Sequence, residues 1–323
     1  MRERTVLIMI DPLVPAAARA RLRQAAADAA PSSWVVSADT LEEALRHAPA
    51  ARVVAGLRVF APVVDRAPGL RWIHAFGAGV DQLVDLPRVR DGRITVTRTV
   101  DAFSAMPEHV LALALALSRR LDVAVRNQLA RRWDRAGAIG WELEGRVMGI
   151  LGLGHIGRRL AARVASLGMR VIGVKRTLEP VAHVERVLAA DGIDELLREA
   201  DVVVALLPLT PATRGLMGER EFRLMKPDAL FINVARGALV QEPALLAALR
   251  NGWIAGAGLD VLDEEPPPSD HPLYALERVI ITPHVAAASP RVFDQMAAAF
   301  AENLRRDAAG EPLLNVVDAA RGY

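Results

Sequence analysis

The sequence lacks cysteine and every common metal-binding pattern, and these absences remove several classes of chemistry. None of its 323 residues is cysteine, which excludes disulfides, thiolate nucleophiles and cysteine-ligated zinc. An HExxH motif, a paired carboxylate set and a Cys/His ligand spacing are also missing. We therefore predict that the protein has no metal site.

The sequence also has little net charge and no long hydrophobic run. Its 40 basic residues, almost all arginine, oppose 38 acidic ones, for a formal net charge of +2. That balance favours neither a nucleic-acid partner nor a membrane surface. The run "VLALALALS" is far shorter than the roughly 20 apolar residues of a membrane span, and "TVLIMI" near the start is interpreted as a first strand rather than a signal peptide. We expect a soluble, cytoplasmic protein.

Short apolar runs recur along the chain, which has 52% hydrophobic residues and enough length for about two domains. From Thr5 to about Thr99 the runs "TVLIMI", "WVVSA", "ARVVAGL", "RWIHAFG" and "ITVTRT" predict a small parallel sheet. From Glu144 to His284 the runs "RVMGILGLG", "RVIGVKR", "ADVVVALLP", "ALFINVARG", "IAGAGLDVL" and "RVIITPH" are nearly continuously apolar, as in strands covered on both faces. The sequence predicts an α/β fold with two Rossmann-like domains, each a doubly wound parallel sheet.

Two long helices are expected to link these domains. One runs unbroken from about Pro107 to Arg132, and the other contains "RVFDQMAAAFAENLRRDAAG". The second helix is expected to carry the C-terminus back to the first domain. We therefore predict a discontinuous substrate domain, residues 1–99 plus 287–323, and a dinucleotide-binding domain, residues 100–286.

A glycine-rich loop, G-x-G-x-x-G, is formed by Gly152, Gly154 and Gly157 between a predicted strand and a predicted helix. In that context the glycines permit a tight turn, a close backbone approach to a pyrophosphate, and close packing of helix on strand. About 20 residues further on, an acid usually binds the adenosine ribose, but this sequence has Lys175, Arg176 and Thr177.

These three side chains suit a 2′-phosphate, so we predict NADP (as NADPH) as cofactor. The alternative is a solvated basic strand end with ordinary NAD binding.

Titratable residues follow three of the later predicted strands, at the sheet edge where ligands of such folds bind. They are Arg236, Asp260 with Glu265 in the loop after it, and His284. Reduction of a 2-oxo acid needs a cation for the carboxylate and carbonyl, which Arg236 offers, and a proton donor, which His284 offers.

Glu265 could hold the imidazole, and Asp260 could accept from the nicotinamide carboxamide. Each side chain alone also suits a structural role: Arg236 as a cap or ion-pair partner, His284 as a loop histidine, and both acids as solvated turn residues.

Several of these segments resemble the D-isomer-specific 2-hydroxyacid dehydrogenase family, namely "GLGHIGRRLA", "LLPLTPATRG", "FINVARGALV", "GLDVLDEEP" and "ITPHVAAAS". "HAFGAGVDQL", "PEHVLALALALSRR" and "NVVDAARGY" resemble its glyoxylate/hydroxypyruvate reductase branch. The resemblance implies that Arg236, Glu265 and His284 are the catalytic set, with His284 the proton donor. It implies that backbone groups of Ala78 and Gly79 bind the substrate carboxylate, and that the protein is a homodimer through the long helix at about Pro107 to Arg132.

The resemblance further implies a cofactor site. The amides of His155 and Ile156 would meet the pyrophosphate, and the remaining contacts would come from Leu207, Pro208, Thr213, Val234, Ala235, Asp260, His284, Ala286 and Ala287.

The function predicted from the sequence is NADPH-dependent reduction of a small 2-oxo acid, such as glyoxylate or hydroxypyruvate, to the D-2-hydroxy acid. Two alternatives remain open: a dehydrogenase for a bulkier 2-hydroxy acid using NAD or NADP, and a non-catalytic dinucleotide-sensing protein. Arg58, in the loop after "ARVVAG", is either a second cation for the substrate or a solvated arginine. Turnover measured on a panel of 2-oxo acids discriminates between the predicted function and its two alternatives.

Overall fold

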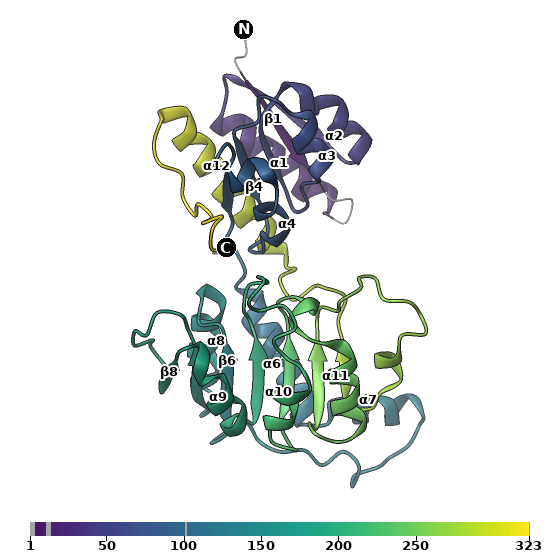
Figure 1. Ribbon diagram of the computed structural model, residues 1–323. Coiled ribbons are helices and arrows are strands. Elements are labelled where there is room, and N and C mark those ends of the chain that lie inside the picture. The colour runs from purple at the N-terminus through teal and green to yellow at the C-terminus, as the bar shows by residue number, and fades with distance from the viewer. Residues whose placement is uncertain (1–3, 11–13, 101, 323) are drawn as a thin grey trace. The chain divides into compact units, whose positions relative to one another are not determined.

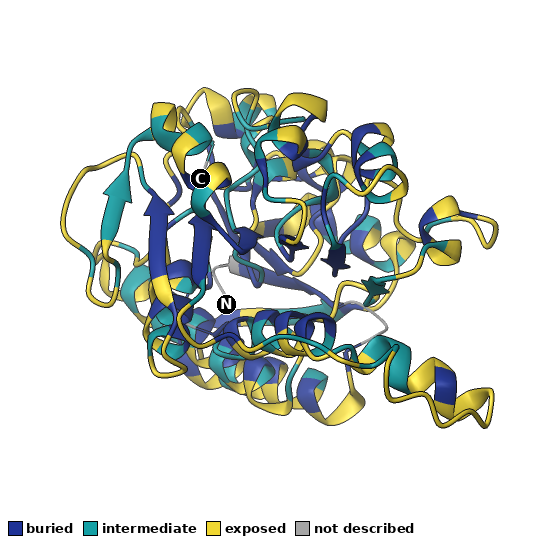
Figure 2. Cartoon of the chain, turned by 90° about the horizontal axis from the view of Figure 1, so that it is seen from below, coloured by how far each residue is buried: buried dark blue, intermediate teal, exposed yellow. Residues whose placement is uncertain are grey.

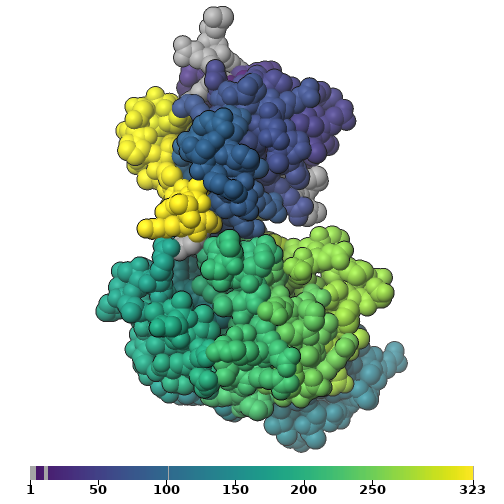
Figure 3. All heavy atoms as spheres, viewed as in Figure 1, coloured from purple at the N-terminus to yellow at the C-terminus, as the bar shows by residue number. Residues whose placement is uncertain are grey.

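The protein, seen here as a computed structural model, is described over residues 4–10, 14–100 and 102–322. It divides into two compact units: unit 1 comprises Met1–Ala102 and Ser289–Tyr323, and unit 2 comprises Phe103–Ala288. Unit 1 is discontinuous in sequence, and its C-terminal residues, yellow in Figure 3, pack against the purple and blue N-terminal ones.

Unit 1 is built on a five-stranded parallel sheet with the order β2-β1-β3-β4-β5. The strands coincide with the predicted apolar runs: β1 (Arg4–Met9), β2 (Ser33–Ala38), β3 (Ala51–Gly56), β4 (Trp72–Ala75) and β5 (Thr95–Arg98). Its helices are α1 (Ala16–Ala29), α2 (Leu41–His47), α3 (Ala61–Arg66), α4 (Asp81–Val84), α5 (Pro87–Arg90) and α12 (Pro290–Ala309), with a 3₁₀ turn η1 (Ala48–Ala50) (Figure 1).

Alternate strand residues point to opposite faces of this sheet, and both faces are covered by other elements of unit 1. On β4, Ile73 packs in the cluster that includes Val54 and Val63. On the other face Trp72 packs against Phe300 of α12, with ring centroids 5.7 Å apart. Helix α12 therefore contributes to the core of unit 1.

The ends of α12 follow from local sequence. Ser289 caps its N-terminus, where Oγ accepts a hydrogen bond from the backbone N of Val292, and Pro290 occupies the first turn. Gly310 ends the helix in a left-handed conformation, with φ of 71°.

Unit 2 is built on a seven-stranded parallel sheet with the order β12-β11-β10-β9-β6-β7-β8. Its strands are β6 (Val147–Leu151), β7 (Arg170–Val174), β8 (Arg186–Leu188), β9 (Val202–Ala205), β10 (Leu230–Asn233), β11 (Gly256–Leu259) and β12 (Val279–Ile281). The helices are α6 (Ala105–Ser118), α7 (Leu121–Leu129), α8 (His155–Ala165), α9 (Ile193–Glu199), α10 (Glu219–Leu224) and α11 (Glu242–Arg250), with 3₁₀ turns η2 (Ala190–Gly192), η3 (Gly237–Leu239) and η4 (Pro272–Ala275).

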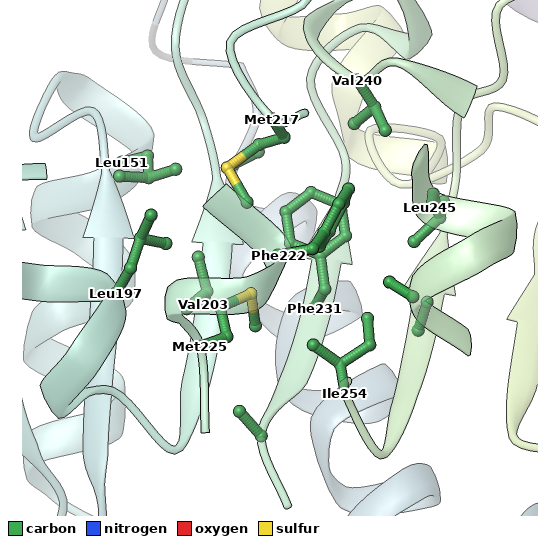
Figure 4. Close-up of a cluster of buried hydrophobic side chains, with 14 of the residues drawn as sticks. Leu151, Leu197, Val203, Met217, Phe222, Met225, Phe231, Val240, Leu245 and Ile254 are labelled. Atoms are coloured by element: carbon green, nitrogen blue, oxygen red, sulfur yellow. The ribbon is translucent and has the colours of Figure 1, made fainter. Parts of the chain in front are cut away.

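Each face of this sheet has its own hydrophobic core. The central strands are buried between helices, whereas the edge strands β8 and β12 are half-buried (Figure 2). Phe231 of β10 points to one face, where its ring meets Phe222 of α10 edge to face at 5.3 Å, as Figure 4 shows. Its neighbours Leu230 and Ile232 point to the other face, into the cluster that contains Val110 of α6 and Leu160 of α8. The prediction of an α/β fold with two doubly covered parallel sheets is confirmed.

The prediction of one unbroken helix from about Pro107 to Arg132 is wrong. The segment forms α6 and α7, and the chain between them turns at Arg120, whose φ of 56° is left-handed. The carbonyl of Ser118 accepts a hydrogen bond from the backbone N of Trp141 at 2.9 Å instead of continuing the helix. A tertiary hydrogen bond, not a helix-breaking residue, therefore ends α6.

The short edge strand β8 is the one described strand of unit 2 that the sequence did not predict. Its three residues are all half-buried, so they lack the continuous apolar run of a central strand. Within the described part of the chain, no helix combines the length and the apolar character needed to cross a membrane.

Candidate functional site in unit 2

The glycine-rich loop joins β6 to α8, and its geometry fits a pyrophosphate cradle. Gly152 has φ of 113°, and a Cβ on Gly157 would lie 2.2 Å from the carbonyl oxygen of Gly152, so both positions require glycine. A Cβ on Gly154 would meet nothing within 4 Å, which leaves the loop open on that side. Because α8 begins at His155, the amides of His155 and Ile156 lie at the N-terminus of the helix, which is a favourable place for an anion.

The loop also lies at the point where the strand order reverses. β6 is flanked by β9 on one side and β7 on the other, and ligands of doubly wound folds bind beyond the carboxyl ends of the strands at this switch. The residues present therefore fit a dinucleotide.

The basic strand end after β7 is partly neutralised within unit 2. Lys175 pairs with Glu179, and Arg158 of α8 donates to the same Glu179 oxygen, Oε1, at 3.1 Å. These cations lower the pKa of the Glu179 carboxyl, chiefly through the hydrogen bond from Lys175. Arg176 and Thr177 follow Lys175 and are exposed. Glu179 is a residue that the sequence analysis missed, and its only sequence signal was its place four residues after Lys175.

Arg236 is positioned by a turn that the buried side chain of Asn233 holds at the end of β10. Asn233 Nδ2 donates to the Arg236 carbonyl at 2.8 Å, and its Oδ1 accepts from the Ala235 backbone N at 3.1 Å. The Arg236 side chain is half-buried, and Nη1 donates to the Ala235 carbonyl at 2.7 Å. The guanidinium thus leaves the strand end in a defined direction, and its planar group of donors suits an anionic ligand.

His284 and Glu265 are brought together at the neighbouring strand ends. His284 Nδ1 lies 2.7 Å from Glu265 Oε2, while the other oxygen, Oε1, accepts from the Leu262 backbone N at 3.1 Å. An ionised carboxylate only accepts hydrogen bonds, so Nδ1 is the donor and Nε2 is left to carry a proton to or from a ligand. The His284 side chain is 53% exposed, so this proton is accessible.

Asp260 holds the segment that carries His284. It follows β11, its side chain is buried, and it accepts from Thr282 Oγ1 at 2.6 Å and from the backbone N of Val285 and Ala286 at 2.9 Å each. These contacts fix the chain on both sides of His284, whose φ of 54° is left-handed. A direct contact between Asp260 and a nicotinamide stays a prediction.

A second residue that the sequence analysis missed completes this network. His109, on α6, lies 2.9 Å from Thr282 Oγ1 through Nε2 and 3.6 Å from Asp260 Oδ1. It lies over 150 positions away from both in the sequence, so only the packing of α6 reveals the contact.

The other predicted cofactor residues lie at the same carboxyl edge of the sheet. Leu207, Pro208 and Thr213 follow β9 and are half-buried, and Thr213 Oγ1 donates to the Pro208 carbonyl at 2.6 Å. Val234 and Ala235 follow β10, and Ala286 and Ala287 follow β12. The sheet therefore gathers these candidate residues of unit 2 along its carboxyl edge.

Three predicted substrate residues belong to unit 1. Ala78 and Gly79 follow β4, and Arg98 Nη1 donates to the Ala78 carbonyl at 2.9 Å, which holds that turn. Arg58 is exposed in the loop after β3. Their role toward a ligand stays a prediction.

Comparison with known proteins finds related sequences along most of the chain. Residues 111–286 match the model of the D-isomer specific 2-hydroxyacid dehydrogenase, NAD binding domain. A glyoxylate reductase from Thermococcus gammatolerans is 37% identical over 282 residues, which cover 85% of this chain and 84% of the relative.

Solved structures are similar over nearly the whole chain. A D-isomer specific 2-hydroxyacid dehydrogenase from Xanthobacter autotrophicus, in complex with NADPH and MES, has a TM-score of 0.84 and 34% identity, with 98% of this chain and 99% of that one covered. An NADPH-dependent glyoxylate/hydroxypyruvate reductase from Sinorhizobium meliloti, in complex with NADP and sulfate, has a TM-score of 0.85 and 27% identity, with 99% and 100% covered. The glycine cradle and these matches together show that the chain is a nicotinamide-dinucleotide-dependent oxidoreductase and belongs to the D-isomer specific 2-hydroxyacid dehydrogenase family.

Proposed function

We propose that this protein reduces a small 2-oxo acid of the glyoxylate or hydroxypyruvate type to the D-2-hydroxy acid, with NADPH as the preferred cofactor. The observation that carries the proposal is the 2.7 Å contact of Glu265 with His284 at the strand ends where Arg236 also lies. When bound, NADPH supplies the hydride for the carbonyl carbon.

The chain's own residues supply the rest of the reaction. Arg236 binds the substrate carboxylate and polarises the carbonyl through its planar set of donors. As the carbonyl carbon gains the hydride, the electron pair of the C=O bond moves to oxygen, and His284 gives that oxygen the proton of Nε2. Glu265 fixes the ring by accepting from Nδ1–H, which aims Nε2 at the substrate.

Further substrate contacts come from unit 1 in this proposal. Backbone groups of Ala78 and Gly79 bind the carboxylate, and Arg58 is a second cation that favours short polar acids over branched apolar ones, because a cation without an anionic partner is costly to bury. The variant Arg58→Ala should raise KM for glyoxylate and hydroxypyruvate. Unchanged KM and substrate ranking in this variant would remove Arg58 from the pocket.

A panel of 2-oxo acids tests the main proposal. Purified protein should oxidise NADPH fastest with glyoxylate or hydroxypyruvate, and His284→Ala should lower kcat about a hundredfold or more while NADPH binding persists. Faster turnover with branched apolar acids would show a dehydrogenase for bulkier substrates, and cofactor binding without turnover would indicate a sensing protein. Near-normal turnover by His284→Ala would mean that another group is the acid.

The cofactor preference has its own test. Lys175, Arg176 and Thr177 stand where an acid would repel a 2′-phosphate, and charge-assisted contacts supply at least about tenfold preference for NADPH over NADH in kcat/KM. Arg176→Ala should remove most of that preference. Equal use of both cofactors by the wild type would refute it.

The protein is further proposed to be a homodimer through α7. The exposed apolar side chains of Leu121, Val125, Leu129 and the following Trp133, here called the α7 stripe, are 51% to 93% exposed. Large exposed apolar surfaces of this kind commonly mark protein interfaces. Asp122 Oδ1 in the same helix is buried and has no hydrogen-bond partner among the described residues.

Light scattering after gel filtration tests the dimer. The wild type should have about 70 kDa, twice the 34.8 kDa chain. Leu129→Asp should shift it toward the monomer, whereas Leu167→Asp, at an exposed leucine outside the α7 stripe, should not. A monomeric wild type would exclude this interface.

A further inference from the structure

Glu179 sits where the proposed 2′-phosphate would have to bind. One of its oxygens, Oε1, contacts both Lys175 and Arg158. These two cations come from different elements, since Lys175 directly follows β7 and Arg158 lies in the first turn of α8. The backbone N of Glu179 donates to the Thr177 carbonyl at 3.0 Å, which folds the loop back so that the carboxylate reaches them.

A carboxylate and a phosphate ester make the same demands on such donors. Both are anions that accept charge-assisted hydrogen bonds from lysine and arginine, and the two anions repel each other when they share a site. Any donor that Glu179 occupies is withheld from a 2′-phosphate. An unphosphorylated ribose, which is uncharged, meets no such repulsion.

Displacement of the Glu179 carboxylate from Lys175 and Arg158 should cost little free energy. The Glu179 side chain is 49% exposed, against 17% for Lys175, so displacement into solvent buries no charge. Next to it is a hollow of about 340 Å³, lined by Arg158, Arg159, Ala162 and residues 180–183. Glu179 is therefore a half-exposed anion beside a more buried cation.

We propose that Glu179 is an internal competitor of the cofactor 2′-phosphate for Lys175 and Arg158, and that it thereby limits how strongly the protein prefers NADP over NAD. This rests on the proposed NADP site. In the NADP complex the phosphate takes the place of the carboxylate on both cations, and Glu179 turns to solvent. In the NAD complex Glu179 stays on Lys175 and Arg158.

Calorimetry with cofactor fragments tests the competition without relying on turnover. The probes are 2′,5′-ADP, which carries the 2′-phosphate, and 5′-ADP, which does not, titrated into full-length wild type and Glu179→Gln. Glutamine keeps the size of the side chain and removes its charge. Since exposed ion pairs contribute little each, the variant should bind 2′,5′-ADP about threefold to tenfold more tightly and 5′-ADP unchanged. The gain should shrink at high ionic strength.

A matched control is Glu185→Gln. Glu185 pairs with Arg170 at 2.8 Å and has a similar exposure of 44%, but within the described part of the chain it forms no ion pair with Lys175 or Arg158. This variant should bind both probes as the wild type does. In a Lys175→Gln background the gain in 2′,5′-ADP affinity caused by Glu179→Gln should shrink, because one of the two cations for which Glu179 competes is absent.

Two results would overturn the inference. Weaker binding of 5′-ADP by Glu179→Gln would mean that Glu179 is a ribose ligand, and unchanged binding of both probes would mean that the ion pairs have no influence on the cofactor. The NADPH to NADH ratio of the wild type tests the proposed function separately. A wild type that prefers NADH, with a variant that gains 2′,5′-ADP affinity, would refute the preference and keep the competition.

Discussion

His74 on β4 makes the stability of unit 1 depend on pH. The residue is fully buried, Nδ1 lies 2.8 Å from Thr97 Oγ1, and Nε2 lies 3.3 Å from Thr99 Oγ1. Its ring packs against Phe300 with centroids 5.1 Å apart. Burial in this apolar surrounding lowers the pKa of His74 from 6.5 to about 3.

The direction of the effect follows from which state binds the proton. The unfolded chain takes up a proton as the pH falls through about 6.5, whereas the folded chain keeps the ring neutral until about pH 3. The stability is therefore complete above the unfolded pKa and is lost as the pH falls through this window. The loss is about 1.4 kcal/mol for each pH unit well inside it, which amounts to about 2 kcal/mol between about pH 7.5 and about pH 5.

The variant His74→Gln isolates this effect. Glutamine has an amide to meet the threonine hydroxyls but does not titrate, so the variant should be less stable at neutral pH and lose about 2 kcal/mol less on acidification. The assay is urea unfolding at about pH 7.5 and at about pH 5. The readout is hydrogen exchange of peptides that cover β4, so that the stability of unit 1 is measured by itself.

The matched control is His47→Gln, at a half-buried histidine of α2 in the same unit, which should keep the pH dependence of the wild type. Equal acid losses in the wild type and in His74→Gln would refute the reasoning, because the buried ring could not then be the titrating group.

Three further predictions concern the carboxyl edge of the unit 2 sheet and the core of unit 2. Glu265→Gln should lower kcat by about tenfold or more, because it replaces the carboxylate that lies 2.7 Å from the His284 ring and orients it; turnover equal to that of the wild type would contradict this. Thr282→Val should lower kcat about tenfold with little change in NADPH affinity, since it removes the hydroxyl that joins His109 to Asp260; Thr282→Ser keeps the hydroxyl and should behave as the wild type, and equal loss in both would exclude a positioning role. Phe222→Ala should destabilise unit 2 by about 3–5 kcal/mol in urea unfolding, because it empties a fully buried site against Phe231; a loss below about 1 kcal/mol would show that the core collapses around it.

The strand pattern and the catalytic candidates could be predicted because they rest on local sequence and one rule of topology. Strands such as β10 and β11 are continuously buried, so the sequence marks them as apolar runs. Parallel neighbours end at the same edge of a sheet, so Arg236 and His284 had to lie along one edge once the runs were recognised. The distance between His284 and Glu265 did not follow from that rule, since it depends on the path of the loop after β11.

The break between α6 and α7 could not be predicted, because the residues around Arg120 include neither proline nor glycine. Helical periodicity continues through the break, and the hydrogen bond from Trp141 that decides it spans 23 positions. The contact of His109 with Thr282 has the same character, since its partners approach only after α6 packs on the sheet. Local preference is overridden in both cases by a tertiary partner.

The segment after β7 shows how a sequence can give the charges of a candidate site without giving their pairing. "KRTLE" gives the signs of the charges after β7, and counting them suggests a site with two free cations for a phosphate. The loop geometry instead brings Glu179 onto Lys175 and onto Arg158 of another helix. The attraction that a 2′-phosphate experiences is then the difference between its own contacts and those of the carboxylate that it displaces. In the proposed competition, selectivity depends on the acid as much as on the bases, so exchange of Glu179 is expected to change it while every cation remains.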